Sequence, residues 1–232
     1  MLKLNRCAFA LLIALPASAF AEVITVITHS DGTTAGDRTT LSALGIQVVD
    51  DSAQQYSLTV TTEYDTENLD SLPNGTQVSM LDAKVTVVLQ FGAQYYQYLG
   101  TARAEAFVYS AFGNREGYQQ NIDLAPSASV DGNYGFRITQ WAFGAPGTFG
   151  NGEPLRPRDF YSADGAMLVN AIPVDPNDVE YYRITDANSN AAVVVTSPVP
   201  EPAPAALVAA GLAVLFWRRR RDSVRISSLC HG

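Results

Sequence analysis

The side chains that could carry out chemistry in this chain of 232 residues are few. It has two histidines and two cysteines, and the cysteines stand near the two ends, at Cys7 and Cys230. A histidine-assisted nucleophile or a Cys/His zinc site needs more of these residues than the middle of the chain supplies. His29, Ser30 and Asp31 are consecutive, and this spacing predicts an exposed turn rather than a triad. We therefore expect no catalytic residue and no metal centre.

Carboxylates leave two alternatives open. Glu63 and Glu105 lie on predicted strand faces opposite the apolar ones, and glycoside hydrolysis uses two carboxylates across a cleft. Asp186, Asn188 and Asn190 match the first three ligand positions of a calcium loop, without its glycine and its bidentate glutamate, and the residues around Asp175 form another acidic turn. The sequence favours solvated turns. A weak calcium site is the one cofactor alternative.

Aromatic side chains are the remaining candidates for binding. Tyr95, Tyr96 and Tyr98 stand together in a segment that resembles a hairpin, and Trp141 belongs to another aromatic segment. Sugar rings stack on exposed aromatic rings, so these four residues are candidate sugar-binding residues. The alternative is that they pack in the core or across strands.

The segment that must position these residues follows a predicted signal peptide, residues 1–21. Two basic residues near the N-terminus precede an apolar run, and Ala19, Phe20 and Ala21 form a small-x-small cleavage site. The mature chain is therefore expected to begin at Glu22. The apolar run is about half of the ~20 residues that a membrane-spanning helix needs, which favours cleavage over anchoring.

Three elements follow each other near the C-terminus. A Pro-rich spacer over residues 197–204 contains the motif Val199, Pro200, Glu201 and Pro202. Residues 205–221 combine a short apolar stretch, predicted to be a transmembrane helix, with a cluster of four arginines, Arg218, Arg219, Arg220 and Arg221. Such a cluster stops translocation on the cytoplasmic side. Residues 222–232 would be a cytoplasmic tail.

This arrangement resembles the PEP-CTERM sorting signal of Gram-negative bacteria that make extracellular polysaccharide. The resemblance implies that Val199–Pro202 is a recognition motif for exosortase, a membrane protease-transpeptidase. It also implies transient anchoring in the inner membrane, followed by release to the cell surface or the extracellular space. The family usually ends at the arginine cluster, whereas this chain continues to Gly232. A plain single-pass anchor is the alternative.

The body between these ends, residues 22–196, is predicted to be one all-β domain. Alternation of apolar and polar residues with period two runs through several segments, and turn signals separate many of them. A short helix is expected over 38–43, and the glycine-rich stretch 144–157 is expected to be a long exposed loop. We predict an antiparallel β-sandwich or jelly roll. The predicted strands are 23–28, 57–64, 83–91, 102–109, 135–143, 166–172, 180–185 and 191–196, with turns that include Asp31-Gly32 and Asp164-Gly165.

Charge and composition limit the partners. The segment 22–200 carries eight basic and 21 acidic residues, a net charge of −13, and this acidity excludes a nucleic-acid partner. The sequence thus favours a non-enzymatic, exported surface or matrix protein that is sorted by exosortase. A carbohydrate-binding module for exopolysaccharide is the second hypothesis, and a secreted polysaccharide-active enzyme is the third.

Overall fold

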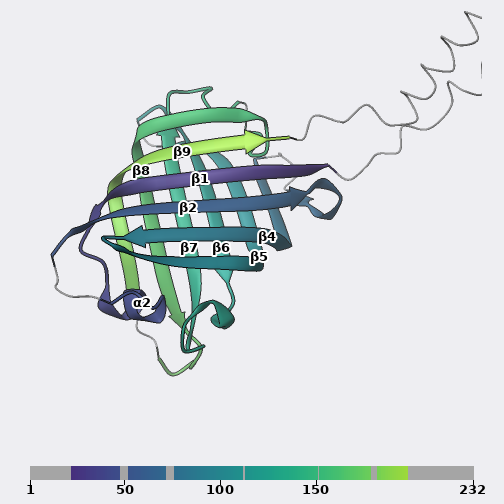
Figure 1. The fold of residues 1–232 in the computed structure, drawn as a ribbon. Coiled ribbons are helices and arrows are strands. Elements are labelled where there is room, and N and C mark those ends of the chain that lie inside the picture. Colours follow the sequence, from purple (N-terminus) through teal and green to yellow (C-terminus); the bar gives the residue numbers. More distant parts are fainter. Residues whose placement is uncertain are drawn as a thin grey trace, which may run out of the picture. The chain divides into compact units, whose positions relative to one another are not determined.

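Eight long antiparallel strands close into a barrel in which each strand pairs with its neighbours in the sequence (Figure 1). The computed structural model describes residues 22–47, 52–71, 76–111, 113–150, 152–178 and 182–197. Short elements complete these ranges: strand β3, helix α2 and two single-turn helices. The elements are β1 (Val23–Thr34), α2 (Arg38–Ala43), β2 (Gln54–Asp65), η1 (Thr66–Asn68), β3 (Asp70–Ser71), β4 (Gln77–Phe91), β5 (Gln94–Ala111), β6 (Arg115–Leu124), η2 (Pro126–Ala128), β7 (Tyr134–Gly144), β8 (Arg158–Pro173) and β9 (Tyr182–Thr196).

The all-β prediction is confirmed, but the sandwich or jelly roll is wrong. The sheet runs in the order β2-β1-β9-β8-β7-β6-β5-β4-β3, and an additional pairing of β2 with β4 closes it. In Figure 1, β1, β2 and β4 cross in front of β6 and β7. A sandwich and a barrel both show one face of each strand to a core, so alternation alone does not distinguish them. Pairing between distant strands decides between the two.

The predicted strands agree unevenly with the observed ones. The helix over 38–43 is confirmed, whereas the predicted turn at Asp31-Gly32 lies inside β1. Strand β6 was not predicted, because its inward positions Tyr118, Gln120 and Ile122 interrupt the apolar pattern with a glutamine. The predicted turn at Asp164-Gly165 falls on an irregularity in the pairing of β8 with β9, within a longer strand.

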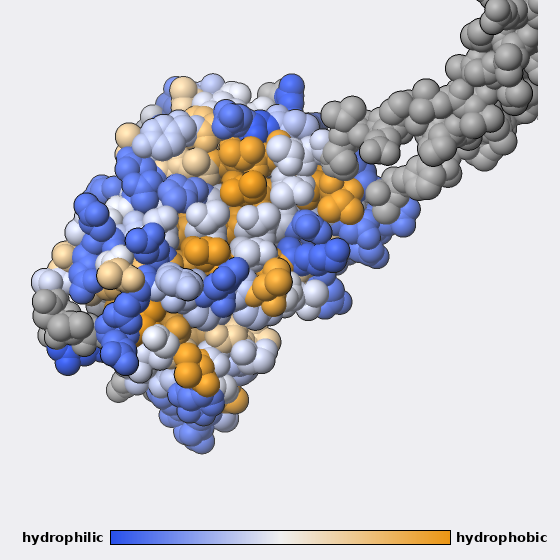
Figure 2. All heavy atoms as spheres, viewed as in Figure 1, coloured by the Kyte–Doolittle hydropathy of each residue, from blue (hydrophilic) through white to orange (hydrophobic). Residues whose placement is uncertain are grey.

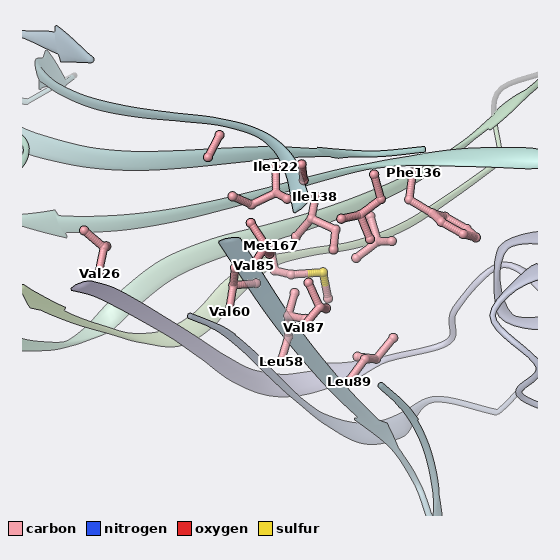
Figure 3. Packing of buried hydrophobic residues seen from close by; sticks show 14 of the residues in the cluster. Val26, Leu58, Val60, Val85, Val87, Leu89, Ile122, Phe136, Ile138 and Met167 are labelled. Atoms are coloured by element: carbon pink, nitrogen blue, oxygen red, sulfur yellow. The ribbon is translucent and has the colours of Figure 1, made fainter. Parts of the chain in front are cut away.

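Apolar side chains from all the long strands fill much of the barrel. Figure 3 shows Val26, Leu58 and Val60 from β1 and β2 facing Ile122 and Ile138 from β6 and β7. These five residues are at most 3% exposed. Burial of their apolar surface stabilises the closed form by roughly 25 cal/mol per Å².

A layer of polar side chains lies inside the same barrel. Gln120 Nε2 donates to Thr62 Oγ1 at 2.7 Å, and Gln140 Nε2 donates to Ser30 Oγ at 2.9 Å. Thr28 Oγ1 lies 2.5 and 2.7 Å from the two glutamine Oε1 atoms, so its single proton can serve either of them. These five residues are buried, and their mutual hydrogen bonds offset the cost of removing them from water.

The two ends of the barrel are covered by different segments. At one end lies α2, where Asp37 caps the helix by accepting from Thr40 N at 2.7 Å and Leu41 is fully buried. Gly36 has a φ of +70°, and a Cβ there would lie 2.7 Å from the Leu41 side chain and 2.9 Å from that of Phe91. This close approach and the left-handed backbone both favour glycine.

The glycine-rich segment covers the other end, and the prediction of an exposed loop is wrong for its apolar residues. Phe149 is 1% exposed, and its ring centroid lies 5.7 Å from that of Tyr118 and 4.7 Å from that of Phe160. Phe149 N donates to Glu116 Oε2 at 2.6 Å. The Arg158 guanidinium lies over the Tyr118 and Phe149 rings at 5.5 and 5.6 Å. The segment thus covers this end of the barrel, and the buried ring of Phe149 holds it there.

Several predictions fall outside the described residues. The signal segment with Ala19 and Ala21, the motif Val199–Pro202, and the apolar segment with Arg218–Arg221 belong to this group. Within the described residues, no helix has the length and apolar character required to cross a membrane.

Candidate binding surface on the outside of the barrel

The three tyrosines predicted to bind sugar lie on β5 but do not share a face. Tyr95 points outward and is 73% exposed, whereas Tyr96 is 8% exposed and donates its hydroxyl to Ala128 O at 3.0 Å. Tyr98 is half-buried against the core and donates to Thr101 O at 3.0 Å. Because successive strand residues alternate between faces, Tyr95 is the one of the three that presents its ring to solvent.

Trp141 lies in a different part of the barrel. Cross-strand pairing places it opposite Gln119 of β6, and Gln119 lies opposite Phe107 of β5. Phe107 is twelve residues further along β5 than Tyr95, which corresponds to about 40 Å of extended strand. The four residues predicted to bind sugar therefore do not form one site, because Trp141 lies far from Tyr95. Other aromatic residues lie on the same face as Trp141.

We define the outer aromatic face as the aromatic residues Phe107, Tyr109 and Trp141 together with the polar residues Gln119, Asn121 and Glu105. All six lie on the outward positions of β5, β6 and β7, and all are half-buried. Neighbouring strands are ~4.8 Å apart, and alternate residues of one strand are ~7 Å apart. From Glu105 to Tyr109 and from β5 to β7, this face therefore covers about 14 by 10 Å.

A chain of hydrogen bonds crosses this face. Trp141 Nε1 donates to Gln119 Oε1 at 2.9 Å, Gln119 Nε2 donates to Asn121 Oδ1 at 2.9 Å, and Asn121 Nδ2 donates to Glu105 Oε2 at 3.3 Å. Arg103 donates to the other oxygen of Glu105 at 2.7 Å. Each amide NH2 has a second proton, and each carboxylate oxygen has further lone pairs. The chain therefore fixes the side chains and leaves polar groups for a ligand.

A glycine makes room for one of the rings. A Cβ built on Gly117 would lie 2.6 Å from Cζ of Tyr109, so the phenol ring of Tyr109 rests directly over the backbone of Gly117. Burial raises the pKa of Tyr109 above its ordinary value. The phenol therefore remains neutral and able to donate a hydrogen bond at neutral pH.

Ion pairs lie at both borders of the outer aromatic face. Arg137 forms a two-bond pair with Asp123, with distances of 2.6 and 2.9 Å, and these hydrogen bonds raise the pKa of Arg137. At the other border, Arg115 lies 4.9 Å above the ring of Phe143 and pairs with Asp164. The charged groups around the face thus neutralise each other, in a body that is otherwise strongly acidic.

The barrel face formed by β1, β2 and β4 differs from this surface. Figure 2 shows apolar residues there in small groups among polar ones. His29 belongs to this side: its Nδ1 lies 2.9 Å from Thr59 Oγ1 and its Nε2 lies 3.2 Å from Asp31 Oδ1. Ser30 points into the barrel and is fully buried. Alternation along β1 therefore separates Ser30 from His29 and Asp31.

The predicted carboxylate pair is divided between two strands. Glu63 on β2 lies 3.5 Å from Lys84 Nζ, and Glu105 on β5 is bound by Arg103. Strand β4 separates the two strands. Each carboxylate thus has its own cation, and Glu105 belongs to the outer aromatic face.

The acidic segment around Asp186 was predicted to be a turn, but Asp186 and Asn190 lie within strand β9, and both acidic segments have internal partners. Asp186 accepts from Tyr56 at 3.0 Å, and Asn190 donates to Asp31 at 2.9 Å, so these two residues of the calcium-like pattern are bound to β1 and β2. Asp175 accepts from Asn177 in a local turn. The described residues contain no group of three or more His, Cys, Asp or Glu that could hold a metal ion.

Comparisons with known proteins give no relative: no family model, no curated protein and no solved structure matches this chain. The fold and the outer aromatic face therefore have to be interpreted from their own geometry.

Phe107, Tyr109, Gln119 and Asn121 were not predicted to belong to the surface. A signal for two of them was present, since Phe107 and Tyr109 alternate with Ala104, Ala106 and Val108, and small or apolar residues mark the inward positions. Gln119 and Asn121 gave no such signal, because the inward Gln120 between them is polar as well.

Proposed function

We propose that this chain is an exported, non-enzymatic surface or matrix protein that is sorted by a PEP-CTERM signal and processed by exosortase. The observation that carries the proposal is the agreement between the barrel and the expected processing sites. Strand β1 begins at Val23, next to the expected mature N-terminus Glu22, and β9 ends at Thr196, three residues before the motif.

The two strands at these boundaries are neighbours. Thr25 of β1 pairs with Thr196 of β9, so the barrel begins and ends on adjacent strands at one end. Removal of the segments outside 22–196 would leave all eight long strands and both covered ends intact. This supports a body that is stable after both processing steps.

The test is mass spectrometry of the protein recovered from the surface and medium of producing cells. We expect a chain that begins at Glu22 and ends near Pro200. The matched variant replaces Pro200 and Pro202 with alanine, and its full-length tail should remain in the membrane fraction. Recovery of a chain with an intact Arg218–Gly232 segment from the medium would contradict the proposal.

Carbohydrate binding is the second candidate function. The observation that favours it is Trp141, a half-buried indole on the outside of the barrel whose N–H donates to an amide side chain at 2.9 Å. An aromatic ring fixed beside hydrogen-bonding groups suits a sugar, which has an apolar ring face and a polar rim.

A further inference from the structure

We propose that the outer aromatic face binds an extended neutral polysaccharide. The inference rests on the carbohydrate-binding candidate and deepens it by naming the residues and the charge of the ligand. Three aromatic side chains, Phe107, Tyr109 and Trp141, lie on the outward positions of two strands with β6 between them. Sugar rings would stack on them.

The polar groups that would bind hydroxyls lie between these rings. Gln119 and Asn121 stand on the middle strand, and each has a second amide proton that the chain of hydrogen bonds across the face does not use. Glu105 accepts from both sides and keeps lone pairs for a third donor. Because the chain of hydrogen bonds holds these side chains in place, a ligand would lose little of its binding energy to ordering them.

The size of the outer aromatic face favours a chain of several sugars over a single sugar as the ligand. An area of about 14 by 10 Å exceeds the ring of a single sugar. The face lies on the outside of the sheet, on outward positions of three neighbouring strands. A polymer could therefore lie across the face and continue beyond it.

The charges at the outer aromatic face and on the whole body favour a neutral polymer as the ligand. Arg103, Arg137 and Arg115 are paired with Glu105, Asp123 and Asp164, so among the described residues each arginine at this face already has a carboxylate partner and is less available to an acidic sugar. The body as a whole carries 21 acidic and eight basic residues. An acidic polysaccharide would be repelled by this net charge, whereas a neutral one would not.

The experiment is affinity electrophoresis of the full-length chain in mild detergent. The gels contain hydroxyethyl cellulose, xyloglucan or laminarin as neutral probes and alginate as the acidic probe. We expect retardation by at least one neutral probe and none by alginate. Trp141→Leu and Tyr109→Leu should each weaken binding about tenfold, whereas Tyr95→Leu, which removes the most exposed of the three predicted tyrosines, should bind as the parent does.

Thermal unfolding of each variant, followed by circular dichroism, controls for loss of the fold, and Gln119→Leu provides a variant that keeps all three rings. Retardation that is lost in Tyr95→Leu and kept in Trp141→Leu would overturn the assignment of the face and leave carbohydrate binding standing. Retardation by alginate alone would overturn the neutral class. Absence of retardation in every gel would overturn carbohydrate binding itself, and the sorting proposal would be unaffected.

Discussion

Two adjacent glutamines have opposite surroundings in this barrel. Gln120 points inward, where it and Gln140 are cross-strand partners in the buried polar layer, whereas Gln119 points outward beside Trp141. Inside, Gln120 donates to Thr62 Oγ1 in the core; outside, Gln119 accepts from Trp141 Nε1 and donates to Asn121 Oδ1 at the surface. The same residue type thus specifies the core on one side of β6 and a candidate binding surface on the other.

The largest loss of stability should come from removing the aromatic ring of the glycine-rich segment that covers one end of the barrel. Phe149→Ala removes a 1%-exposed ring that packs on Tyr118 and Phe160, and we expect a loss of about 3–5 kcal/mol in the free energy of unfolding. Urea denaturation followed by circular dichroism measures it. A loss below about 1 kcal/mol would mean that the segment does not belong to the core.

The two glutamines provide a matched pair of variants. Gln120→Ala leaves a cavity and deprives Thr62 of its donor, so we expect a loss of about 2–4 kcal/mol in the free energy of unfolding. Gln119→Ala should cost less than about 1 kcal/mol, because Gln119 is only half-buried on the outside of the barrel and water can replace its hydrogen bonds. Equal losses in urea denaturation would contradict the contrast between inside and outside.

Alkaline pH should lower the free energy of unfolding through the tyrosines that are buried inside the barrel. Burial raises the pKa values of Tyr64 and Tyr118 well above the ordinary value of a tyrosine. Stability is then fully present below the unfolded pKa of about 10. Above it, the unfolded state loses protons that the native state keeps, and stability falls by up to ~1.4 kcal/mol per pH unit for each residue.

Urea denaturation at a series of pH values measures this loss. The double variant Tyr64→Phe, Tyr118→Phe should lose stability less steeply above pH ~10, because two of the buried phenols are gone. An identical slope in the parent and the variant would exclude these residues as the cause.

The smallest effect concerns single hydroxyl groups. The Tyr118 hydroxyl is buried and has no hydrogen-bond partner among the described residues, so Tyr118→Phe should be neutral or stabilise the barrel by up to about 1 kcal/mol. Tyr96→Phe is the contrasting variant, since it loses the bond to Ala128 O and should cost about 1 kcal/mol. Thermal unfolding of both variants tests the difference. A destabilised Tyr118→Phe would show that its hydroxyl is bound.

Local patterns were sufficient for part of this structure. Short-range rules predicted the helix over 38–43, where Asp37 caps the first turn, and the strands with regular alternation. They failed at β6, where Gln120 occupies a core position because Thr28 and Thr62, distant in the sequence, bond to it. They also failed at Phe149, since nothing in a glycine-rich segment indicates that it will fold back onto a barrel end.

For the candidate surface too, the sequence was sufficient for some residues and not for others. Trp141 was recognised from its type alone, and Tyr95, Tyr96 and Tyr98 were grouped with it because they are close in the sequence. Alternation along one strand puts Tyr95 and Tyr96 on opposite sides. The pairing of β5 with β6 and of β6 with β7 puts Phe107 and Tyr109 on the same face as Trp141, across β6.

The all-β class and the acidity of the body follow from the sequence alone, because composition and alternation are local properties of the chain. The closure into a barrel, the buried glutamines and the outer aromatic face were decided by tertiary structure alone. The reason is that strand pairing joins residues far apart in the chain, and one step of register moves a side chain from the core to the surface.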